Sequence, residues 1–568
     1  MQKLSKRFLF FSAIFLSCML SLTACNAGNV SLKPNETTQQ NFTEANSDTG
    51  TKPKTTTESE SSTAEQSSAQ PTVGYDVWDG SVATEFAGGS GTQEDPYIIE
   101  TAAQLAFLSE QICNNRENTY SDKCYKLNNN LDMNGHEWLP IGSVALDPEY
   151  QDSTNGVFTG SFDGNGHIIT RLYITDYADQ ENKYCGLFGT LAGDVSNLNI
   201  EAVSVSSLSA TGLIYIGGVA GVISNSTIKN CTVTGLTVSS IIESNQLHIG
   251  GIAGGTGYNA SIQSCQASGY DISPTSLNGG EPICVGGILG SAAYATLNEC
   301  NTSGTIKVLQ DNKNEDVEGL GIYIGGIIGY DLSSSVVSNC STTCIIEASA
   351  STSVGIGGIS GKSQQGSYQN CHTTGSIAVH SFSFVCGGIT GSATNATLQS
   401  CSSDMSIDAS GRSDSMAGGL VGLASTITAN DSFAVGNVNI AITKESSYLF
   451  AAGGFAGGAN NAQISNCYAT GHITAKGTEQ VYAAGFIAVG GGTFSNCYAK
   501  GNVYTTGSPE HGYVGGFYGY GSPTLENCYR FEEQIISHND TPYTANDGGT
   551  PCPASQIEEF INQFKSES

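Results

Sequence analysis

Basic residues are scarce in this chain of 568 residues, which holds 21 Lys and Arg against 51 Asp and Glu. The resulting net charge of -30 argues against nucleic acids and anionic lipids as electrostatic partners, because both are negatively charged themselves. Charged residues of either sign make up only 13% of the sequence. The acidic excess has a plain alternative role in keeping the protein soluble.

Common motifs of metal and nucleophile chemistry are also missing. His136-Glu137 is not followed by a second His at the spacing of a metalloprotease helix. The acidic loop at 311–316 lacks the central Gly and the terminal Glu of a calcium-binding EF-hand loop. No Gly-x-Ser-x-Gly segment stands between a strand and a helix, where a nucleophilic Ser would need it. We therefore predict no catalytic residue, no metal site and no cofactor.

Paired carboxylates for glycoside hydrolysis have only weak candidates. Asp404 and Asp408 are close in sequence, as are Asp414 and Asp431 one repeat later, but nothing fixes them as a pair. Base rates favour exposed, structural carboxylates at such positions. A β-helix polysaccharide lyase would need a Lys or Arg base, and residues 184–530 show no cluster of these.

What the sequence does have is an internal repeat, seen most clearly in Val354–Gly361 and the following Tyr368–Cys371. A Gly-Gly pair, or its one-residue equivalent, recurs every 30 to 39 residues, and a Cys or Ser follows each pair after 13 to 15 residues. Fixed periods of this size predict a solenoid, and a degenerate copy at 185–189 makes about eleven repeats. The pairs begin at Gly217, Gly250, Gly286, Gly325, Gly357, Gly387, Gly418, Gly453, Ala484 and Gly515, and the second column is Cys231, Cys265, Cys300, Cys340, Cys371, Cys401, Ser432, Cys467, Cys497 and Cys528.

One repeat contains three candidate strands, at 358–361, 368–371 and 376–379, with turns at 363–366 and 372–375. Three strands and three corners would close one rung, so we predict an all-β, right-handed parallel β-helix of about eleven repeats of about 30 residues, and the sequence leaves open whether each repeat is one rung. One apolar residue after each Gly-Gly pair should point inward as a continuous column. Its members are Ile252, Ile288, Ile327, Ile359, Ile389 and Leu420.

The region 75–183 has a different pattern, which predicts a small mixed module that caps the start of the solenoid. Asp95–Ile99 reads as a turn and strand, 101–108 as a helix with Thr101 as N-cap, and 125–133 as a further strand. The run at 163–166, Asp-Gly-Asn-Gly, needs a turn with positive φ.

These segments resemble the module that precedes GLUG repeats in bacterial surface proteins, and the Gly-Gly-Ile-x-Gly…Asn-Cys…Thr-Gly pattern resembles the GLUG repeat itself. The resemblance covers roughly residues 88–530. It implies a right-handed parallel β-helix exposed at the cell surface. It implies little about activity, because such repeats accompany both adhesin-like proteins and enzymes carried on other domains.

The first 24 residues have the pattern of a signal peptide, with a basic start and an apolar run from Phe8 to Leu22 that is short for a spanning helix. Leu22-Thr23-Ala24-Cys25 resembles the lipobox of bacterial lipoproteins, which implies cleavage before Cys25 and attachment of acyl chains to it. A plain secretory signal is the alternative. Residues 25–74 are rich in Ser and Thr and poor in large apolar residues, so we predict a disordered tether.

The cysteine column allows two interpretations. A small apolar thiol suits the narrow interior of a solenoid, where free Cys behaves as a buried hydrophobic residue. Disulfides between rungs are possible in an exported protein, but neighbouring rungs lie near the short limit of disulfide geometry, which favours free thiols. Cys113 and Cys124 lie outside the column and are the better disulfide candidates.

The residue after the cysteine column becomes aromatic in the last four copies: Phe433, Tyr468, Tyr498 and Tyr529. Strand alternation points these rings outward if the cysteines point inward. They form either a strip that binds sugar rings or a partner protein, or the seat of an end cap that solenoids require. The amphipathic segment 556–564, within a C-terminal region at 531–568, is the candidate cap.

Together these features predict a surface-exposed protein of the cell membrane, anchored by lipid at Cys25, that acts as a non-enzymatic adhesin or binding scaffold. The expected partners are the membrane, through that anchor, and a glycan or a host or cell-wall protein, and not nucleic acid. A carbohydrate-active β-helix enzyme and a passive cell-wall spacer remain as alternatives.

Overall fold

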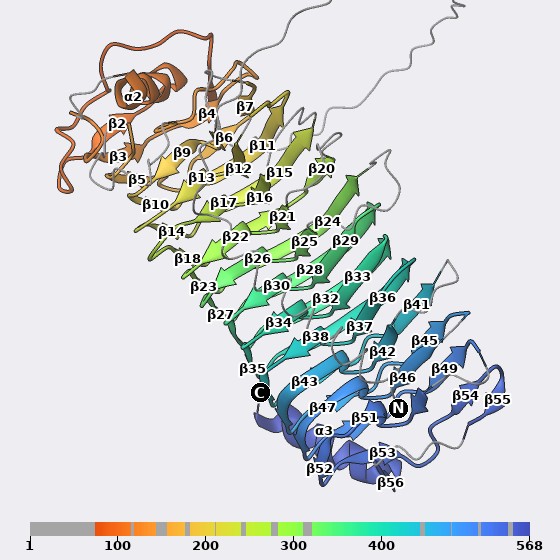
Figure 1. Cartoon of the computed structure of the whole chain (residues 1–568). Helices are drawn as coiled ribbons and strands as arrows, with labels where there is room; N and C mark the ends of the chain where they lie inside the picture. Colours follow the sequence, from red (N-terminus) through yellow and green to blue (C-terminus); the bar gives the residue numbers. More distant parts are fainter. Residues whose placement is uncertain are drawn as a thin grey trace, which may run out of the picture. The chain divides into compact units, whose positions relative to one another are not determined.

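The computed structural model describes residues 74–114, 119–143, 156–176, 182–210, 212–239, 246–273, 282–310, 321–442, 449–478, 480–508, 513–543 and 549–567. These residues form a parallel β-solenoid in which each turn of chain, or rung, stacks on the next (Figure 1). Three sheets run along the solenoid, and nearly every strand pairs in parallel with the equivalent strand of the next repeat, as in the register of Ile356 with Cys386. Each repeat forms one rung, which the sequence alone left open.

The short sheet precedes the Gly-Gly pairs. Its 11 strands are β8 (Lys183–Cys185), β12 (Leu213–Gly217), β16 (Gln246–Gly250), β21 (Ile283–Gly286), β25 (Ile322–Gly325), β29 (Ser353–Gly357), β33 (Ser383–Gly387), β37 (Ser415–Gly418), β42 (Phe450–Gly453), β46 (Val481–Ala484) and β50 (Tyr513–Gly515).

The bent sheet follows the Gly-Gly pairs, and most rungs contribute two strands to it, one on each side of a corner. Its 23 strands are β2 (Tyr97–Ile99), β3 (Cys124–Leu127), β5 (Ser161–Asp163), β9 (Phe188–Leu191), β10 (Asp194–Ser196), β13 (Ala220–Ile223), β14 (Thr227–Lys229), β17 (Ala253–Thr256), β18 (Ser261–Gln263), β22 (Leu289–Ala293), β23 (Thr296–Asn298), β26 (Ile328–Ser333), β27 (Val336–Ser338), β30 (Ser360–Gln364), β31 (Ser367–Gln369), β34 (Thr390–Thr394), β35 (Thr397–Gln399), β38 (Val421–Ser425), β39 (Thr428–Asn430), β43 (Ala456–Ser465), β47 (Ile487–Ser495), β51 (Tyr518–Gly521) and β52 (Thr524–Glu526).

The broad sheet follows the cysteine column. Its 22 strands are β1 (Tyr75–Val77), β4 (Asn130–Asp132), β6 (Ile168–Thr170), β7 (Tyr173–Ile174), β11 (Asn199–Ser206), β15 (Thr232–Ser239), β19 (Gln266–Ser268), β20 (Asp271–Ser273), β24 (Asn301–Gln310), β28 (Ser341–Ala350), β32 (His372–His380), β36 (Ser402–Gly411), β40 (Phe433–Ala434), β41 (Val438–Ile442), β44 (Tyr468–Ala469), β45 (Ile473–Lys476), β48 (Tyr498–Ala499), β49 (Val503–Thr506), β53 (Tyr529–Phe531), β54 (Ile536–His538), β55 (Thr541–Pro542) and β56 (Thr550–Cys552).

The solenoid interior is a continuous apolar core along all three sheets. The column predicted to point inward is confirmed, since each of its members is fully buried. Stacking identical positions lets every rung bury its apolar face against its neighbours, which is how a solenoid gains stability without a single large core. The buried members are Ile252, Ile288, Ile327, Ile359, Ile389 and Leu420.

The corner between the bent and broad sheets is built by the residue before each column cysteine. Asn370 has a φ of 51°, in the left-handed region that Asn tolerates better than most residues. Its amide Nδ2 donates to Asn339 Oδ1 of the preceding rung at 3.1 Å, so the corner side chains bond along the stack. The same bond links Asn230 to Asn197, Asn496 to Asn466 and Asn527 to Asn496.

Two details of the predicted rung are wrong. The Gly-Gly pair does not lie inside a strand: Gly357 ends β29, and β30 begins only at Ser360, so the pair turns the chain between two sheets. The segment 372–375, predicted as a turn, lies inside β32. Gly375 occupies that strand at a φ of 117° because a Cβ there would come within 2.1 Å of the carbonyl oxygen of Cys344.

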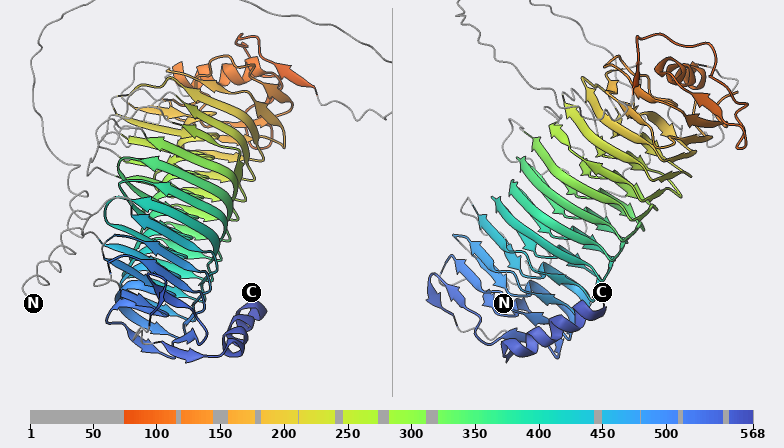
Figure 2. Two further views of the ribbon diagram at one scale, coloured as in Figure 1. Left: turned by 90° about the vertical axis from the view of Figure 1, so that its right-hand side faces the viewer. Right: turned by 180° about the vertical axis from the view of Figure 1, so that it is seen from behind.

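The N-terminal region is continuous with the solenoid. β3 pairs with β5, which pairs with β10, and β4 pairs with β6, which pairs with β11. Its helix, α2 (Ala102–Asn114), begins as predicted: Gln104 N donates to Thr101 Oγ1, and Thr101 N donates to Gln104 Oε1. Asn165 and Gly166 have the positive φ values expected of the turn at 163–166. The second helix, α3 (Ala554–Glu567), packs on the last rungs (Figure 2).

Candidate functional site

The aromatic residues after the cysteine column do point outward and do stack. Phe433, Tyr468, Tyr498 and Tyr529 are register partners in successive rungs. The rings of Phe433 and Tyr468 lie 4.7 Å apart and nearly parallel, and those of Tyr498 and Tyr529 lie 5.2 Å apart. We call these four residues the covered ladder, because α3 lies over them.

The C-terminal segment covers this ladder, as the capping alternative proposed. Phe560 of α3 lies 4.0 Å from the ring of Tyr498, centroid to centroid, and Ile557 is fully buried in the same cluster. Tyr468 and Tyr498 are consequently 3% and 8% exposed. Burial raises the pKa of each phenol to about 12. An exposed strip that could stack on a ligand is therefore not formed by these residues.

The column cysteines point into the core. Nine of these ten positions carry a thiol, and each thiol is buried. Burial raises the pKa of Cys467 and Cys497, which keeps both as neutral thiols. The sixteen cysteines that the structure describes form no disulfide. Cys113 and Cys124, the disulfide candidates outside the column, are among these free cysteines.

The carboxylates considered for hydrolysis do not converge. Asp404 and Asp408 are both exposed on β36, four residues apart, which places them roughly 13 Å from each other along the strand. Asp414 Oδ1 accepts a hydrogen bond from Leu449 N at 2.6 Å, and burial raises its pKa. Asp431 accepts from the corner amide of Asn466. The loop at 311–316 and Cys25 lie outside the described residues.

A buried carboxyl inside the solenoid was missed by sequence reasoning. Asp331 is fully buried at an inward position of β26, opposite Ser363. Its Oδ2 accepts from Ser363 Oγ at 3.0 Å and from Tyr368 Oη at 3.3 Å, while Oδ1 has no hydrogen-bond partner. Burial raises the pKa of Asp331. The sequence did hold a signal for it, because the same register position is Asp331 in one rung and Ser363 and Ala393 in the next two.

Outward residues of the short sheet and the bent sheet meet along a seam beside the Gly-Gly corners. The ring of Tyr215 stacks on His248 at 4.5 Å, and burial lowers the pKa of His248 to about 4. Further along, the ammonium of Lys362 lies 5.0 Å from the ring centre of Tyr323 and 4.9 Å from that of Tyr330. The seam thus consists of side chains that cover one another.

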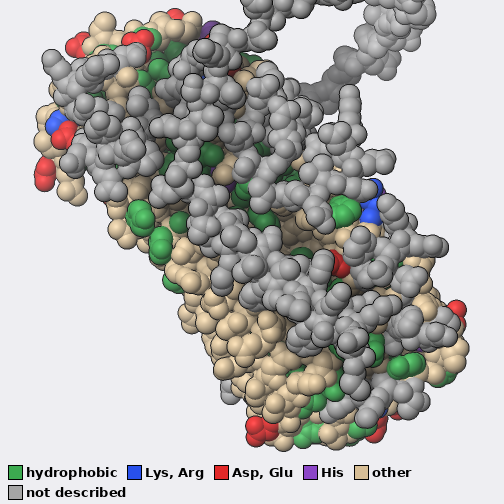
Figure 3. Space-filling view, viewed as in Figure 1, with side chains coloured by type: hydrophobic (Ala, Val, Ile, Leu, Met, Phe, Trp, Pro, Cys, Tyr) green, Lys and Arg blue, Asp and Glu red, His purple; other side chains and the backbone are tan. Residues whose placement is uncertain are grey.

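Near the C-terminal end the seam opens into a tyrosine cluster, which we define as Tyr482, Tyr513 and Tyr520. Tyr482 and Tyr513 are register partners whose rings stack 5.2 Å apart. The ring of Tyr520 lies 4.5 Å from that of Tyr513. Tyr482 is 7% exposed, but Tyr513 and Tyr520 are 38% and 39% exposed. In the space-filling view, hydrophobic side chains also reach the surface near this end of the solenoid (Figure 3).

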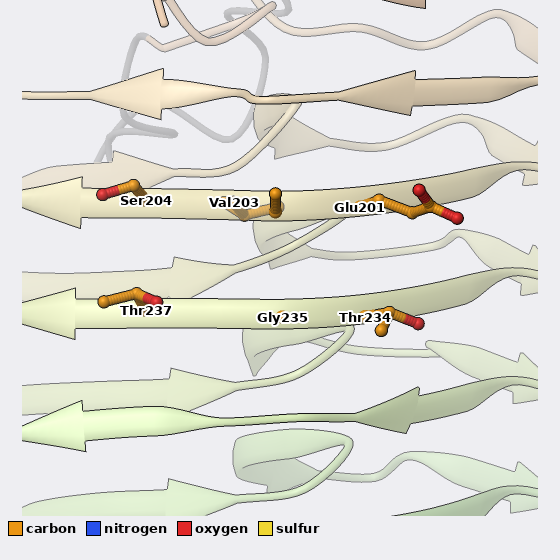
Figure 4. Close-up of a pocket in the computed structure, with 7 residues that line it drawn as sticks. Glu201, Val203, Ser204, Thr234, Gly235 and Thr237 are labelled. Carbon is orange, nitrogen blue, oxygen red and sulfur yellow. The ribbon is translucent and has the colours of Figure 1, made fainter. Parts of the chain in front are cut away.

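A depression of about 510 Å³ lies on the broad sheet over β11 and β15. Figure 4 shows its side chains lying along two neighbouring strands rather than enclosing a space. Ala202 and Gly235 both line the depression and have positive φ values. Glu201 is its one ionisable residue, so the lining gives no pair of groups for acid–base chemistry.

No helix in the described residues combines the length and apolar character needed to cross a membrane. Within these residues, no three His, Cys, Asp or Glu side chains gather where they could share a metal ion.

Comparison with known families finds the GLUG motif at residues 212–239 and 448–474. The first match spans β12 to β15, and the second runs from β42 into the start of β45, so each covers about one rung. The predicted resemblance is confirmed: the chain carries GLUG repeats, and one repeat is one turn of the solenoid.

Relatives match over part of the chain. A "Putative Gly-rich membrane protein" of Evansella cellulosilytica is 34% identical over 151 residues, which are 25% of this chain and 16% of that protein. Halomucin of Haloquadratum walsbyi is 32% identical over 165 residues, 28% of this chain and 2% of halomucin. The chain therefore spans less than a fifth of either relative. A crystal structure of a putative immunoglobulin A1 protease from Bacteroides ovatus aligns over 84% of this chain and 90% of that one, at 16% identity and a TM-score of 0.24.

Proposed function

We propose that this protein is a lipid-anchored surface scaffold that presents a β-solenoid for binding glycan or protein outside the cell. The observation that carries the proposal is the outer face of the broad sheet. There β24, β28, β32 and β36 pair in register over nine or ten residues each. Inward residues alternate with outward ones, so four adjacent strands present one extended face to solvent.

Most side chains on this face are small and polar, and several bond to the equivalent residue of the next rung. His372 and Ser402 share a hydrogen bond of 2.7 Å, as do His380 and Ser410 at 2.8 Å. Such bonds fix side-chain positions before a ligand arrives, which reduces the entropy lost on binding. An extended, preorganised polar face suits a binding scaffold better than a catalytic site, which needs a concave pocket.

The N-terminal pattern supports the location. Leu22-Thr23-Ala24-Cys25 would place acyl chains at Cys25, and the tether at 26–74 would separate the solenoid from the membrane. Two relatives that match part of the chain are named a membrane protein and a halomucin, which agrees with a place at the cell surface.

Surface display and ligand binding can be tested together. Cells expressing the full chain are labelled with a membrane-impermeant amine reagent, and the Cys25→Ser variant is compared. We expect labelling of the intact cells, and loss of the variant from the membrane fraction. Purified full chain is then applied to arrays of glycans and extracellular proteins, where at least one ligand should bind. Absence of both labelling and ligand would contradict the proposal.

A further inference from the structure

The tyrosine cluster is built as a platform with a buried base. Tyr482 is 7% exposed and packs with Ala451, Ala488 and Val489, so its ring is fixed in place. Tyr513 stacks on it almost in parallel, with 8° between the ring planes. The two exposed rings, Tyr513 and Tyr520, therefore rest on an apolar base and lose little freedom when a ligand covers them.

The described strands around the cluster contain no charged residue. The strands that hold the three tyrosines, together with the register partners before them, are β42, β43, β46, β47, β50 and β51, and none of these six contains Lys, Arg, Asp or Glu. The whole chain has a net charge of -30, which repels polyanions. These six strands thus offer a ligand stacking and uncharged polar groups.

The exposed area limits the size of the occupant. Two tyrosines that are 38% and 39% exposed offer roughly 150–200 Å² of aromatic surface, given the usual area of such side chains. A stable protein interface needs about 800 Å² on each partner. The exposed rings match one or two sugar rings and fall well short of a protein partner.

An exposed polar group lies two rungs before Tyr520. Val489 of β47 is the register partner of Tyr520, and Gly491, two residues further along β47, pairs with Asn460 of β43. Asn460 is thus two rungs and two residues from Tyr520, or about 12 Å between Cα atoms, which is the scale of two linked sugar rings. Asn460 is exposed, and its amide both donates and accepts, as sugar hydroxyls require.

We propose that Tyr513 and Tyr520 form a binding site for an uncharged pyranose unit of a neutral glycan. The C–H face of the sugar lies on the two rings, whose negative faces attract its hydrogens, and Asn460 bonds to a hydroxyl of the adjacent unit of the glycan. This site rests on the proposed function, since it supplies one ligand class for the surface scaffold.

The test uses purified full chain and isothermal titration calorimetry with cellohexaose and chitohexaose, and with hexagalacturonate as the anionic comparison. We expect a neutral hexasaccharide to bind, and the Tyr513→Ala/Tyr520→Ala double variant to bind it about tenfold or more weakly. The Tyr513→Phe/Tyr520→Phe variant keeps the rings and should stay within about threefold of the parent. Asn460→Ala should weaken binding without abolishing it.

The chain offers a matched control. Tyr258 and Tyr294 also stack, 5.5 Å apart, and are 67% and 49% exposed. They are absent from the three apolar clusters of the structure, so they lack a buried base. Tyr258→Ala/Tyr294→Ala should therefore leave the affinity unchanged. Equal thermal unfolding of all variants shows that they fold, and Tyr520→Ala alone replaces the double variant if that one fails to fold.

The outcomes separate this inference from the proposed function. Binding that survives the double alanine variant, binding lost in the control pair, or binding of hexagalacturonate alone overturns the tyrosine site. If the arrays still find a ligand and cells still display the chain, the scaffold proposal stands. If neither hexasaccharide binds the parent, the site is overturned, whatever the arrays show.

Discussion

The solenoid has two stacks of aromatic side chains near its C-terminal end, one of them buried and the other partly exposed. In the covered ladder, Tyr468 and Tyr498 are 3% and 8% exposed beneath α3. In the tyrosine cluster, Tyr513 and Tyr520 are 38% and 39% exposed. Both stacks arise in the same way, because a parallel register places equivalent side chains of successive rungs beside one another.

The difference shows that parallel register stacks the rings but does not determine whether the stack is buried or exposed. A stacked row of rings is an apolar surface, and either another part of the chain or a ligand can cover it. At the covered ladder, Ile557 and Phe560 arrive from a helix outside the repeats. At the tyrosine cluster, the apolar contacts come from within the repeats and reach only the base of the stack.

The largest loss of stability should follow from detaching α3 from the covered ladder. Ile557 is fully buried under α3, and Ile557→Asp both deletes its apolar contacts and buries a carboxyl, at a cost of about 4 kcal/mol or more. We expect α3 to detach and amide hydrogen exchange in β48 and β53 to accelerate. Ser555→Asp, at an exposed position of the same helix, is the control and should change neither. Unchanged protection in Ile557→Asp would show that α3 is not what covers the ladder.

Removing a single ring from each stack compares how much a buried and an exposed ring contribute to the free energy of unfolding. Tyr498→Ala deletes a buried ring and should lower the free energy of unfolding by about 3 kcal/mol. Tyr513→Ala deletes a ring that is 38% exposed, and we expect a loss of about 1 kcal/mol or less. Denaturant titration of the two variants side by side measures both. Equal losses would mean that the exposed stack is as structural as the covered one.

The pH dependence of the covered ladder offers a smaller, spectroscopic effect. Burial raises the pKa of Tyr468 and Tyr498 to about 12, because it disfavours the charged phenolate. An unfolded tyrosine ionises near pH 10, so the unfolded state gives up these protons first, and the ladder loses stability as the pH rises from about 10 to 12. Burial also raises the pKa of Tyr125, Tyr215, Tyr270 and Tyr368, which lie away from α3. Absorbance at the phenolate band should therefore show several late-titrating rings, and two fewer of them in Ile557→Asp. An unchanged number of late-titrating rings in that variant would contradict the assignment.

The repeat architecture could be predicted because each repeat carries two separate sequence markers. The Gly-Gly pair, or its equivalent at Ala484, precedes the column cysteine, or Ser432, by 13 to 15 residues in each of ten copies. Both the inward apolar column and the helix at Thr101 also followed from local pattern. Strand boundaries were less predictable. Gly375 suggested a turn, but it lies within β32, because close contact with the rung before it, rather than chain reversal, requires glycine there.

The candidate sites were predictable only in part. Outward direction of Tyr498 followed from strand alternation, whereas its burial depends on where α3 docks, which no repeat pattern contains. The tyrosine cluster was missed for another reason. Tyr513 precedes the last Gly-Gly pair and Tyr520 follows it, so the two belong to different columns that meet only when the corner folds.

The smallest expected effect tests what holds α3 in place. Lys500 Nζ lies 3.8 Å from Glu558 Oε1 and 5.9 Å from the ring centre of Phe531, and both charged side chains are substantially exposed. Such a surface pair contributes roughly 0–1 kcal/mol, against several for buried Ile557. Lys500→Ala should therefore leave hydrogen exchange in β48 nearly unchanged, with or without 1 M salt. A loss of protection as large as that of Ile557→Asp would mean that charge, rather than apolar contact, distinguishes the covered ladder from the open cluster.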